Sequence, residues 1–307
     1  MSGAEEAHAG SPAGDAPRIG IIGGSGFYNM PGLTGVEEVR VETPFGPPSD
    51  AIILGTLAGR RVAFLPRHGR GHVISPSELP VRANIWALKS LGVQRLLSIS
   101  AVGSMQEGIA PSDLVVPDQL IDRTVNRPRT FFGEGLVAHV SLADPYCPQL
   151  RSALVGAGHA ASAPIHDGGT YIVIEGPQFS TRAESRLFRS WGVAVIGMTA
   201  MPEARLAREA ELCYVNLALA TDYDSWHDVH ESVTAGLVMQ NLARSVQAAQ
   251  ATVTGLVANL VDQVAAGCPC AHALDGAIMT APDKIPTGVR ERLGPILGRV
   301  LAPAANH

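Results

Sequence analysis

Apolar residues occur along this chain mainly in short continuous runs that end in glycines or polar turn residues. Runs of this kind are typical of strands that are buried on both faces of a sheet. We therefore expect strands in seven segments: 19–24, 50–57, 60–66, 95–100, 170–176, 193–198 and 213–220. The second and third segments flank Ala58-Gly59, which predicts a hairpin between them.

Segments with helical periodicity lie between these runs. We expect helices over residues 80–92, 182–192, 232–266 and 288–300. Pro80 suits a first helical turn, and Gly92 and Gly192 suit C-terminal caps. The third helix is expected to be interrupted near residues 252–255, where β-branched residues meet a glycine. Strands that alternate with helices predict an α/β fold in which helices flank a central sheet.

Nothing in the chain divides it into two independent domains, because it has no internal repeat, charge block or low-complexity linker. We expect one domain over residues 18–300, with a disordered tail over 1–17 and a short tail over 301–307. The first tail contains acidic residues and has no apolar core, unlike a secretory signal or a basic transit peptide. The chain has no run of about 18 apolar residues, so we expect no membrane-spanning helix.

The composition places the chain among globular proteins that bind small molecules. Hydrophobic residues make up 46% and charged residues 17%, which excludes general disorder. The net charge of −5 argues against nucleic acid as a partner, since phosphate contacts require a basic surface. The cysteines, 4 in number and scattered, are too few for a disulfide scaffold, which favours a reducing, cytoplasmic compartment.

A glycine-rich segment, Gly23–Phe27, directly follows the first predicted strand. Glycines there allow backbone N–H groups to converge on an anion, and Ser25 adds a hydroxyl donor. A dinucleotide site would need a third glycine in a segment that opens a helix, but Asn29 occupies that position of the motif. The alternatives that remain are a phosphate loop and an ordinary glycine turn.

Arg67 and His68 follow another predicted strand, and ligands bind at the carboxyl ends of strands in α/β sheets. The planar guanidinium of arginine matches phosphate oxygens. His68 and His72 have the spacing of a helical zinc pair, but the glycines between them disfavour a helix, so we expect no metal there. A solvated basic loop is the alternative.

A second loop of small residues is expected over 100–104, after the strand over 95–100. If the sheet is parallel there, this loop reaches the same edge as Gly23–Phe27, and the two could cradle one oxyanion. Neither Ser100 nor Ser104 lies in the G-x-S-x-G pattern of a hydrolase nucleophile, and an ordinary turn is the alternative.

Asp222 and Asp224 lie two residues apart after the apolar segment 213–220, so they share a side if the strand continues. Burial and mutual repulsion would let one carboxyl keep a proton and act as a general acid, while the other accepts hydrogen bonds from a ligand. The alternative is a turn in which Asp224 caps the following helix.

Cys268, Cys270 and His272 resemble part of a metal site. They lack a fourth ligand and the two-residue spacing of zinc knuckles, so we expect a structural turn and no metal. The sequence alone does not assign a role to these two cysteines.

Together the motifs resemble the trimeric purine nucleoside phosphorylase superfamily, and within it the S-methyl-5′-thioadenosine phosphorylases. They occur in family order between Ile19 and about Val238: IGIIGGSGF, TPFGPPSDAIILG, RHGRGH, RANIWALK, DQLIDRT, RP, IEGPQFSTRAES, MTAMPEA and ATDYDSW. So many ordered motifs are far more specific than any single one. The resemblance implies a phosphorylase fold with a central mixed β-sheet flanked by helices.

The resemblance also implies roles for individual residues. The implied phosphate site comprises Ser25, Arg67, His68, Ser100, Ala101 and Thr199. The implied nucleoside site comprises Phe179, Ser180, Met198, Asp222, Asp224, Ala235 and Val238, with Met198 against the ribose and Asp224 and Asp222 as the catalytic pair. His139 corresponds to a residue that reaches into the 5′ pocket of a neighbouring subunit, which implies a homotrimer.

Three positions imply a 6-aminopurine with an apolar 5′ substituent. Relatives that use 6-oxopurines carry Glu and Asn where this chain has Ser180 and Asp222, and a carboxylate suits an exocyclic amino group. Those relatives place a histidine near Ala235, whereas the thioadenosine enzymes have an apolar residue there.

The implied reaction is reversible phosphorolysis of 5′-methylthioadenosine to adenine and 5-methylthioribose 1-phosphate. Phosphate is then a co-substrate, and no organic cofactor or metal is expected. The alternatives are a phosphorylase for methylthioinosine or 6-oxopurine nucleosides, and a nucleotide-binding protein without activity.

Overall fold

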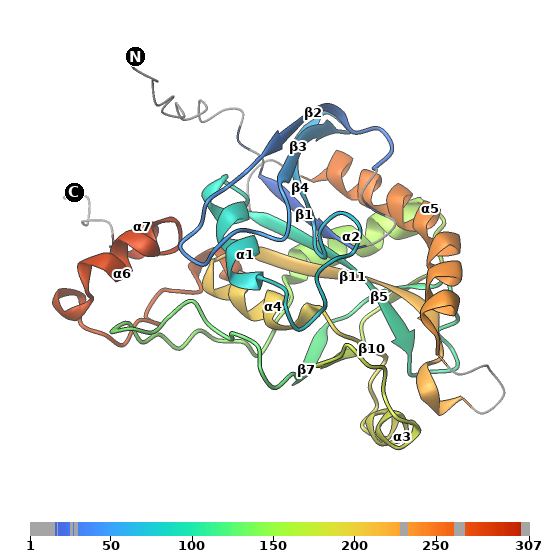
Figure 1. The fold of residues 1–307 in the computed structure, drawn as a ribbon. Coiled ribbons are helices and arrows are strands. Elements are labelled where there is room, and N and C mark those ends of the chain that lie inside the picture. The colour runs from blue at the N-terminus through green and yellow to red at the C-terminus, as the bar shows by residue number, and fades with distance from the viewer. Residues whose placement is uncertain are drawn as a thin grey trace, which may run out of the picture.

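The structure is a computed structural model that describes residues 16, 18–24, 27, 30–227, 233–260 and 268–301. Within this part of the chain, 11 strands form one mixed sheet (Figure 1). The main path, in spatial order, is β2 (Thr34–Val39), β3 (Ile52–Leu57), β4 (Arg60–Pro66), β1 (Ile19–Gly23), β5 (Arg95–Ser104), β10 (Val195–Gly197), β9 (Thr170–Ile174) and β7 (Gln119–Arg123). A second path leads from β5 through β11 (Cys213–Asp222) and β6 (Leu114–Val116) to β8 (Ile165–Asp167). The predicted α/β fold with a mixed central sheet is confirmed.

Successive residues of the central strands face two different layers of helices. Ile21 belongs to the core that includes α2 (Pro148–Ala160) and α5 (Ala235–Asn259). Ile22 belongs to the core that includes α1 (Val81–Ser90) and α4 (Ala200–Glu209). Because both faces of β1 are covered, its sequence is apolar throughout rather than alternating.

Three further helices lie nearer the periphery. α6 (Thr287–Arg292) and α7 (Gly294–Leu301) join the core of α1 and α4, on the opposite side of the molecule from α5 in Figure 1. α3 (Arg182–Ser190) packs on a third, smaller cluster that includes residues of β9 and β10. Short 3-10 helices cover Asp224–Trp226, Pro269–His272 and Pro282–Lys284. In the part of the chain that the structure describes, no helix has the length and apolar character to cross a membrane.

The predicted hairpin between β3 and β4 is confirmed. The two strands pair antiparallel, and Ala58 and Gly59 between them have φ of 49° and 78°. Two positive φ values in succession are the geometry of a type I′ turn, whose twist suits a two-residue hairpin. The helices predicted over 80–92 and 182–192 are also confirmed, as α1 and α3.

The loop predicted over 100–104 is wrong, because β5 continues through these residues. β11 pairs parallel with β5 as far as Gly103, and β10 pairs antiparallel with Gly103 and Ser104. Both pairings join segments that lie far apart in the sequence. They extend the strand through small residues whose local propensity favours a turn.

The predicted interruption of the third helix is also wrong, since α5 is continuous from Ala235 to Asn259. Thr252 and Thr254 donate side-chain hydrogen bonds to carbonyl oxygens one turn back, at 2.8 and 2.9 Å. Gly255 lies beside Ala157 of α2, where an added Cβ would make ordinary van der Waals contact, and it does not end the helix. Tertiary contacts therefore override the local propensity.

Instead of one helix over 288–300, the structure has α6 and α7. The two helices meet at Leu293 and Gly294, directly before Pro295. Proline has no N–H to continue the hydrogen bonds of α6, whereas the first turn of a helix, where Pro295 lies in α7, tolerates it. Apart from Ala16 and Leu301, the predicted tails lie outside the described residues, as do residues 261–266 of the predicted third helix.

Candidate active site

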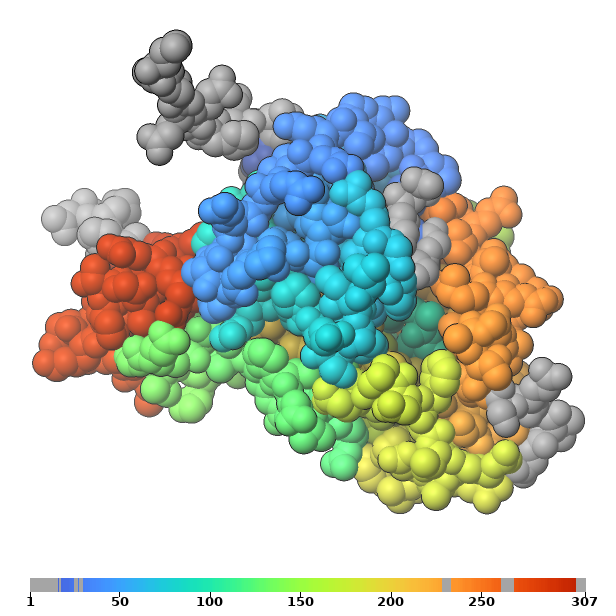
Figure 2. Space-filling view, viewed as in Figure 1, coloured from blue at the N-terminus to red at the C-terminus, as the bar shows by residue number. Residues whose placement is uncertain are grey.

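A pocket opens where the sheet divides around β5. β1 pairs with β5 only as far as Ser98, and β10 pairs with it only from Gly103. The intervening segment of β5 has neither strand beside it on that edge, and it lines the pocket. Figure 2 shows the opening as a hollow between the cyan segment after β4, the yellow-green segment before α3 and the orange α5. A division in an α/β sheet is a common place for a ligand site.

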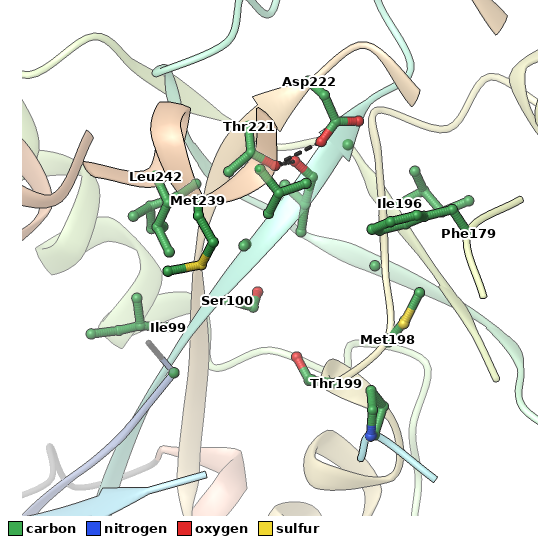
Figure 3. Close-up of a pocket in the computed structure, with 18 of the residues that line it drawn as sticks. Ile99, Ser100, Phe179, Ile196, Met198, Thr199, Thr221, Asp222, Met239 and Leu242 are labelled. Carbon is green, nitrogen blue, oxygen red and sulfur yellow. Dashed lines mark hydrogen bonds between the residues drawn. The ribbon is translucent and has the colours of Figure 1, made fainter. Parts of the chain in front are cut away.

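The pocket brings together most of the residues that the resemblance implies. Those that line it are Arg67, His68, Ser100, Ala101, Phe179, Ser180, Met198, Thr199, Asp222, Asp224 and Val238. In Figure 3, Asp222 lies at one end of the group, Thr199 at the other and Ser100 between them. Ser25 lies outside the described residues. Ala235 and His139 are exposed and are not among the lining residues.

Arg67 is buried, and most of its guanidinium is bound to the protein itself. Nε and Nη2 donate to the two carboxylate oxygens of Glu203, at 2.6 and 3.3 Å, and Nη2 also donates to Ser98 Oγ at 2.7 Å. The sequence predicts that this planar fork binds phosphate, whereas in the structure it binds Glu203. Nη1 makes one hydrogen bond, to Ile99 O at 2.7 Å, and so keeps a proton for a ligand.

Glu203 is the centre of a buried polar network that no local pattern in the sequence indicates. The residue is 1% exposed, and its Oε2 also accepts hydrogen bonds from Ser98 Oγ at 2.8 Å and the Tyr214 hydroxyl at 3.1 Å. Asn216 extends the network, because it donates to Ser98 Oγ at 3.1 Å and accepts from Ser100 Oγ at 3.2 Å. A buried network of this kind fixes the orientation of each member. The only signal in the sequence was a carboxylate within the motif MTAMPEA.

His68 is held in one orientation by the turn that follows it. Its Nδ1 donates to Ile74 O at 2.8 Å, because a carbonyl oxygen can only accept, so Nε2 carries the lone pair. Burial lowers the pKa of His68 to about 4, which makes the ring neutral at pH 7. His72 stacks on His68 with ring centroids 4.2 Å apart. Gly69 and Gly71 have positive φ, so this segment is a turn and not a helix.

Two buried hydroxyl groups of the pocket have no hydrogen-bond partner in the described part of the protein. They are Thr199 Oγ1 and Ser180 Oγ, and each residue is 8% exposed. A buried hydroxyl without a partner costs about 1–3 kcal/mol. Because both residues line the pocket, a polar ligand is the natural partner for each.

Arg127 positions the wall of the pocket that carries Met198. Its Nη1 donates to Met198 O at 2.5 Å and to Met201 O at 2.8 Å, and its Nη2 donates to the carbonyl oxygens of Ile174 and Glu175. The guanidinium thus joins the end of β9 to the start of α4. From the sequence, Arg127 is only part of a family motif, and nothing there indicates this positioning role.

Asp222 ends β11 and lies against the backbone of β5. Its Oδ2 accepts from Thr221 Oγ1 at 2.7 Å, and its Oδ1 accepts from Asp224 N at 2.8 Å. A Cβ atom on Gly103 would lie 3.0 Å from Oδ1, so the close approach depends on glycine. Burial raises the pKa of Asp222 to about 6.

Asp224 reaches the same pocket through a turn, because the strand does not continue as far as this residue. β11 ends at Asp222, and Asp224 has φ of 46°, an unusual value for a residue other than glycine. Its Oδ2 accepts a hydrogen bond from Ser185 Oγ of α3, and burial raises its pKa. The alternative role as a cap is not observed, because the 3-10 helix here has Tyr223 as its N-cap and no side-chain cap.

The chain matches known phosphorylases over most of its length. The family model for the phosphorylase superfamily matches residues 18–258. The S-methyl-5′-thioadenosine phosphorylase of Chloroflexus aurantiacus is 56% identical over 282 residues, which cover 92% of this chain and 97% of that protein. The enzyme of the same name from Gloeobacter violaceus is 53% identical over 288 residues, with coverage of 92% and 95%.

Solved structures of methylthioadenosine phosphorylases are also similar to this chain. A methylthioadenosine phosphorylase sourced from an antarctic soil metagenomic library has a TM-score of 0.87 at 49% identity, over 92% of this chain and 99% of that one. The methylthioadenosine phosphorylase from Schistosoma mansoni, solved in complex with adenine, has a TM-score of 0.76 at 38% identity, over 79% and 91% of the two chains.

Proposed function

This chain belongs to the phosphorylase superfamily, and we propose that it cleaves 5′-methylthioadenosine with phosphate to give adenine and 5-methylthioribose 1-phosphate. The observation that carries the choice of substrate is the pair of buried carboxyls, Asp222 and Asp224, in one pocket with Arg67 and His68. The carboxyls bind the base, and the other two residues lie on the side that binds phosphate.

Adenine presents two different groups to the carboxyl pair. Its 6-amino group donates a hydrogen bond, which an ionised Asp222 accepts, whereas N7 only accepts, which requires a proton on Asp224. Burial raises the pKa of both carboxyls, which makes a proton on Asp224 less costly when N7 of the bound base requires one. A 6-oxopurine would present two acceptors, O6 and N7, and would mismatch this arrangement.

The protein groups that bind phosphate are mainly uncharged hydrogen-bond donors, and together they carry little net positive charge. Arg67 is the only arginine or lysine among the described residues that line the pocket, and Glu203 balances its charge. The donors for phosphate are then Arg67 Nη1, Thr199 Oγ1 and the open edge of β5 that includes Ala101. Neutral His68 offers the lone pair of Nε2, which suits the hydroxyl of hydrogen phosphate.

The reaction replaces one bond at C1′ of the ribose by another. A phosphate oxygen forms the C1′–O bond as the C1′–N9 bond breaks, through a state with oxocarbenium character at the sugar. The electron pair of the broken bond moves into the adenine ring, and Asp224 donates its proton to N7 as that density grows. No organic cofactor or metal is required, because phosphate itself is the nucleophile.

The sugar and its 5′ substituent meet an apolar wall. The apolar residues that line the pocket include Met198, Val238, Met239 and Phe179. Ala235 begins α5, three residues before Val238, and lies outside the lining residues of this chain's own pocket. An alkylthio group therefore fits this side better than a 5′-hydroxyl, whose hydrogen bonds would be left unmade.

We propose that the enzyme is a homotrimer and that His139 completes the 5′ pocket of a neighbouring subunit. His139 is exposed and lies outside the pocket of its own chain. Beside it, Val137 and Met279 are joined by a backbone hydrogen bond and are 50% and 66% exposed, which is typical of a surface that a partner covers.

Sedimentation of the active protein should therefore give three times the chain mass of 32.1 kDa. His139→Ala should raise the KM for methylthioadenosine and leave that for phosphate unchanged. A fully active monomer would contradict the proposal of a shared site.

The proposed substrate is tested by base release from methylthioadenosine, methylthioinosine and inosine at saturating phosphate. We expect kcat/KM to be highest for methylthioadenosine, since only this substrate satisfies both carboxyls and the apolar wall. A preference for either 6-oxopurine would show that a different purine is the substrate. Tight binding of these nucleosides without any base release would instead favour a binding protein.

Activity should fall as the pH drops below the pKa of Asp222. Since burial raises this pKa to about 6, the carboxyl is ionised at pH 7 and protonated at pH 5, where it no longer accepts the amino proton. We expect kcat/KM for methylthioadenosine to be about tenfold lower at pH 5 than at pH 7. Asp222→Asn is the matched control, because phosphate ionisation affects both proteins alike. An equal decline in both would exclude Asp222 as the titrating group.

A further inference from the structure

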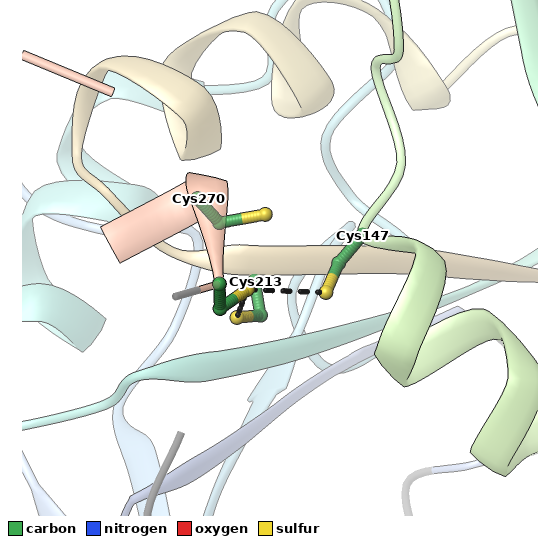
Figure 4. A group of neighbouring side chains, drawn as sticks. Cys147, Cys213 and Cys270 are labelled. Atoms are coloured by element: carbon green, nitrogen blue, oxygen red, sulfur yellow. Dashed lines mark hydrogen bonds between the residues drawn. The ribbon is translucent and has the colours of Figure 1, made fainter. Parts of the chain in front are cut away.

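Four cysteines form a buried cluster at the end of β11 that is remote from Asp222. Cys147 directly precedes α2 and Cys213 begins β11, while Cys268 and Cys270 lie at the start of the 3-10 helix over Pro269–His272. Figure 4 shows how segments from different parts of the chain meet at this point. The four residues are 1–3% exposed, and all four are free thiols.

The cluster has the dimensions of a tetrahedral thiolate site. All four sulfur atoms lie within 4.8 Å of one another. Cys268 Sγ lies 3.8 Å from Cys147 Sγ and 3.5 Å from Cys213 Sγ. A tetrahedral zinc ion with Zn–S bonds of about 2.3 Å separates its sulfurs by about 3.8 Å. An ion could therefore enter with little movement of the chain.

We propose that Cys147, Cys213, Cys268 and Cys270 bind one Zn²⁺ ion as a structural site. Four sulfur ligands in a tetrahedron are the set that favours zinc over harder divalent ions. A site with four protein ligands keeps no open position for a substrate, which distinguishes it from a catalytic zinc. Binding converts four thiols into thiolates and releases four protons, so the complex carries a charge of −2.

The surroundings of the cluster suit this negative charge. Arg95 and Arg208 are both buried, at 6% and 8% exposure. Arg95 interacts electrostatically with Cys213 and Cys147, and Arg208 with Cys270. A doubly negative complex in an otherwise apolar core would be costly, and two nearby guanidinium groups offset that cost.

The sequence does not predict this site, because its ligands come from three separate segments. Only Cys268, Cys270 and His272 are close together in the chain, and they supply too few ligands. In the structure His272 is exposed and contacts Asp275 at 3.1 Å, so it does not join the cluster. Cys147 and Cys213 supply the two missing sulfurs instead.

The ion would join the C-terminal segment to the core. Cys268 and Cys270 begin the described segment 268–301, which contains α6 and α7, whereas Cys147 directly precedes α2 and Cys213 begins β11. Backbone hydrogen bonds already hold the two core cysteines, from Cys147 N to Tyr214 O and from Cys213 N to Gln94 O. A metal that links segments distant in the sequence stabilises the folded state by its binding free energy.

The test is the metal content and thiol count of the full-length protein, purified with a reductant and without chelators. We expect one zinc per chain by elemental analysis, and replacement by Co²⁺ should give the intense visible bands of a tetrahedral thiolate complex. Zinc-free protein with four titratable thiols would overturn the proposal. Loss of titratable thiols without any metal would also overturn it, because the cluster would then hold disulfides.

Two variants locate the ion. Cys270→Ser should lower zinc affinity by more than about 100-fold, since it removes one ligand. His272→Ala is the matched control, because this residue is two positions away in the chain but outside the cluster, and its zinc content should equal that of the wild type. If Cys270→Ser does not fold, the cobalt spectrum of the wild type still decides the question. Equal zinc affinity in both variants would place the ion elsewhere and contradict the proposal.

Discussion

Replacement of Asp224 by asparagine is expected to lower kcat for methylthioadenosine by about 100-fold or more, the usual contribution of a general acid. The amide has nearly the same shape and can still donate a hydrogen bond to N7, but it cannot transfer a proton as the C1′–N9 bond breaks. KM should change much less, because N7 gains electron density only as the reaction proceeds. Steady-state kinetics at saturating phosphate separate the two effects.

Asp222→Asn is the matched comparison, since this carboxyl lies beside Asp224 but has a different proposed role. An amide at position 222 can donate to O6, so the variant should shift preference from methylthioadenosine toward methylthioinosine. The lost or mismatched hydrogen bond is worth about 1–3 kcal/mol in a buried site. If Asp224→Asn keeps its kcat and Asp222→Asn keeps its base preference, the pair only orders the turn after β11.

The second large effect concerns the buried ion pair below the phosphate side of the pocket. Glu203→Ala should lower the free energy of unfolding by about 3–5 kcal/mol, because Arg67 would remain buried without its counter-charge. Both side chains are at most 2% exposed, with Nε and Oε1 2.6 Å apart. The KM for phosphate should also rise, since the network that orients Ser98 and Ser100 loses its centre. Chemical denaturation and phosphate kinetics measure the two effects.

The double variant Arg67→Met, Glu203→Leu separates charge burial from loss of packing. It removes both charges and keeps similar volume, so it should be more stable than Glu203→Ala, while phosphate-dependent activity stays low. If Glu203→Ala lowers the free energy of unfolding by less than about 1 kcal/mol, water or another group compensates the charge of Arg67. The ion pair would then not be the main stabilising contact on the phosphate side of the pocket.

The fold follows from the sequence wherever a single segment carries the signal. β1, β4 and β11 are apolar runs because helices cover both faces of the sheet, and the turn at Ala58-Gly59 fixes the hairpin. Prediction from the sequence fails where contacts between segments distant in the chain decide the secondary structure. β5 extends to Ser104 only because β10 and β11 pair with it there. α5 continues through Gly255, where the helix lies against Ala157 of α2.

The same distinction holds for the site. Asp222, Asp224, Arg67 and His68 follow strands and could be identified as candidates from that position alone. The groups that orient them could not be identified in this way, because Glu203 contacts Arg67 across 136 positions of the chain. The four cysteines also come together only in the folded chain, over 121 positions between Cys147 and Cys268. Residues that act through long-range contacts leave no local pattern to read.

The most direct test of the central claim is ³¹P NMR of the reaction of methylthioadenosine with inorganic phosphate. We predict that each adenine released is matched by one phosphate converted to a sugar 1-phosphate, and that adenine release stops when phosphate is omitted. Equal adenine release without phosphate, with free methylthioribose as the second product, would contradict phosphorolysis and show that water is the nucleophile in this pocket.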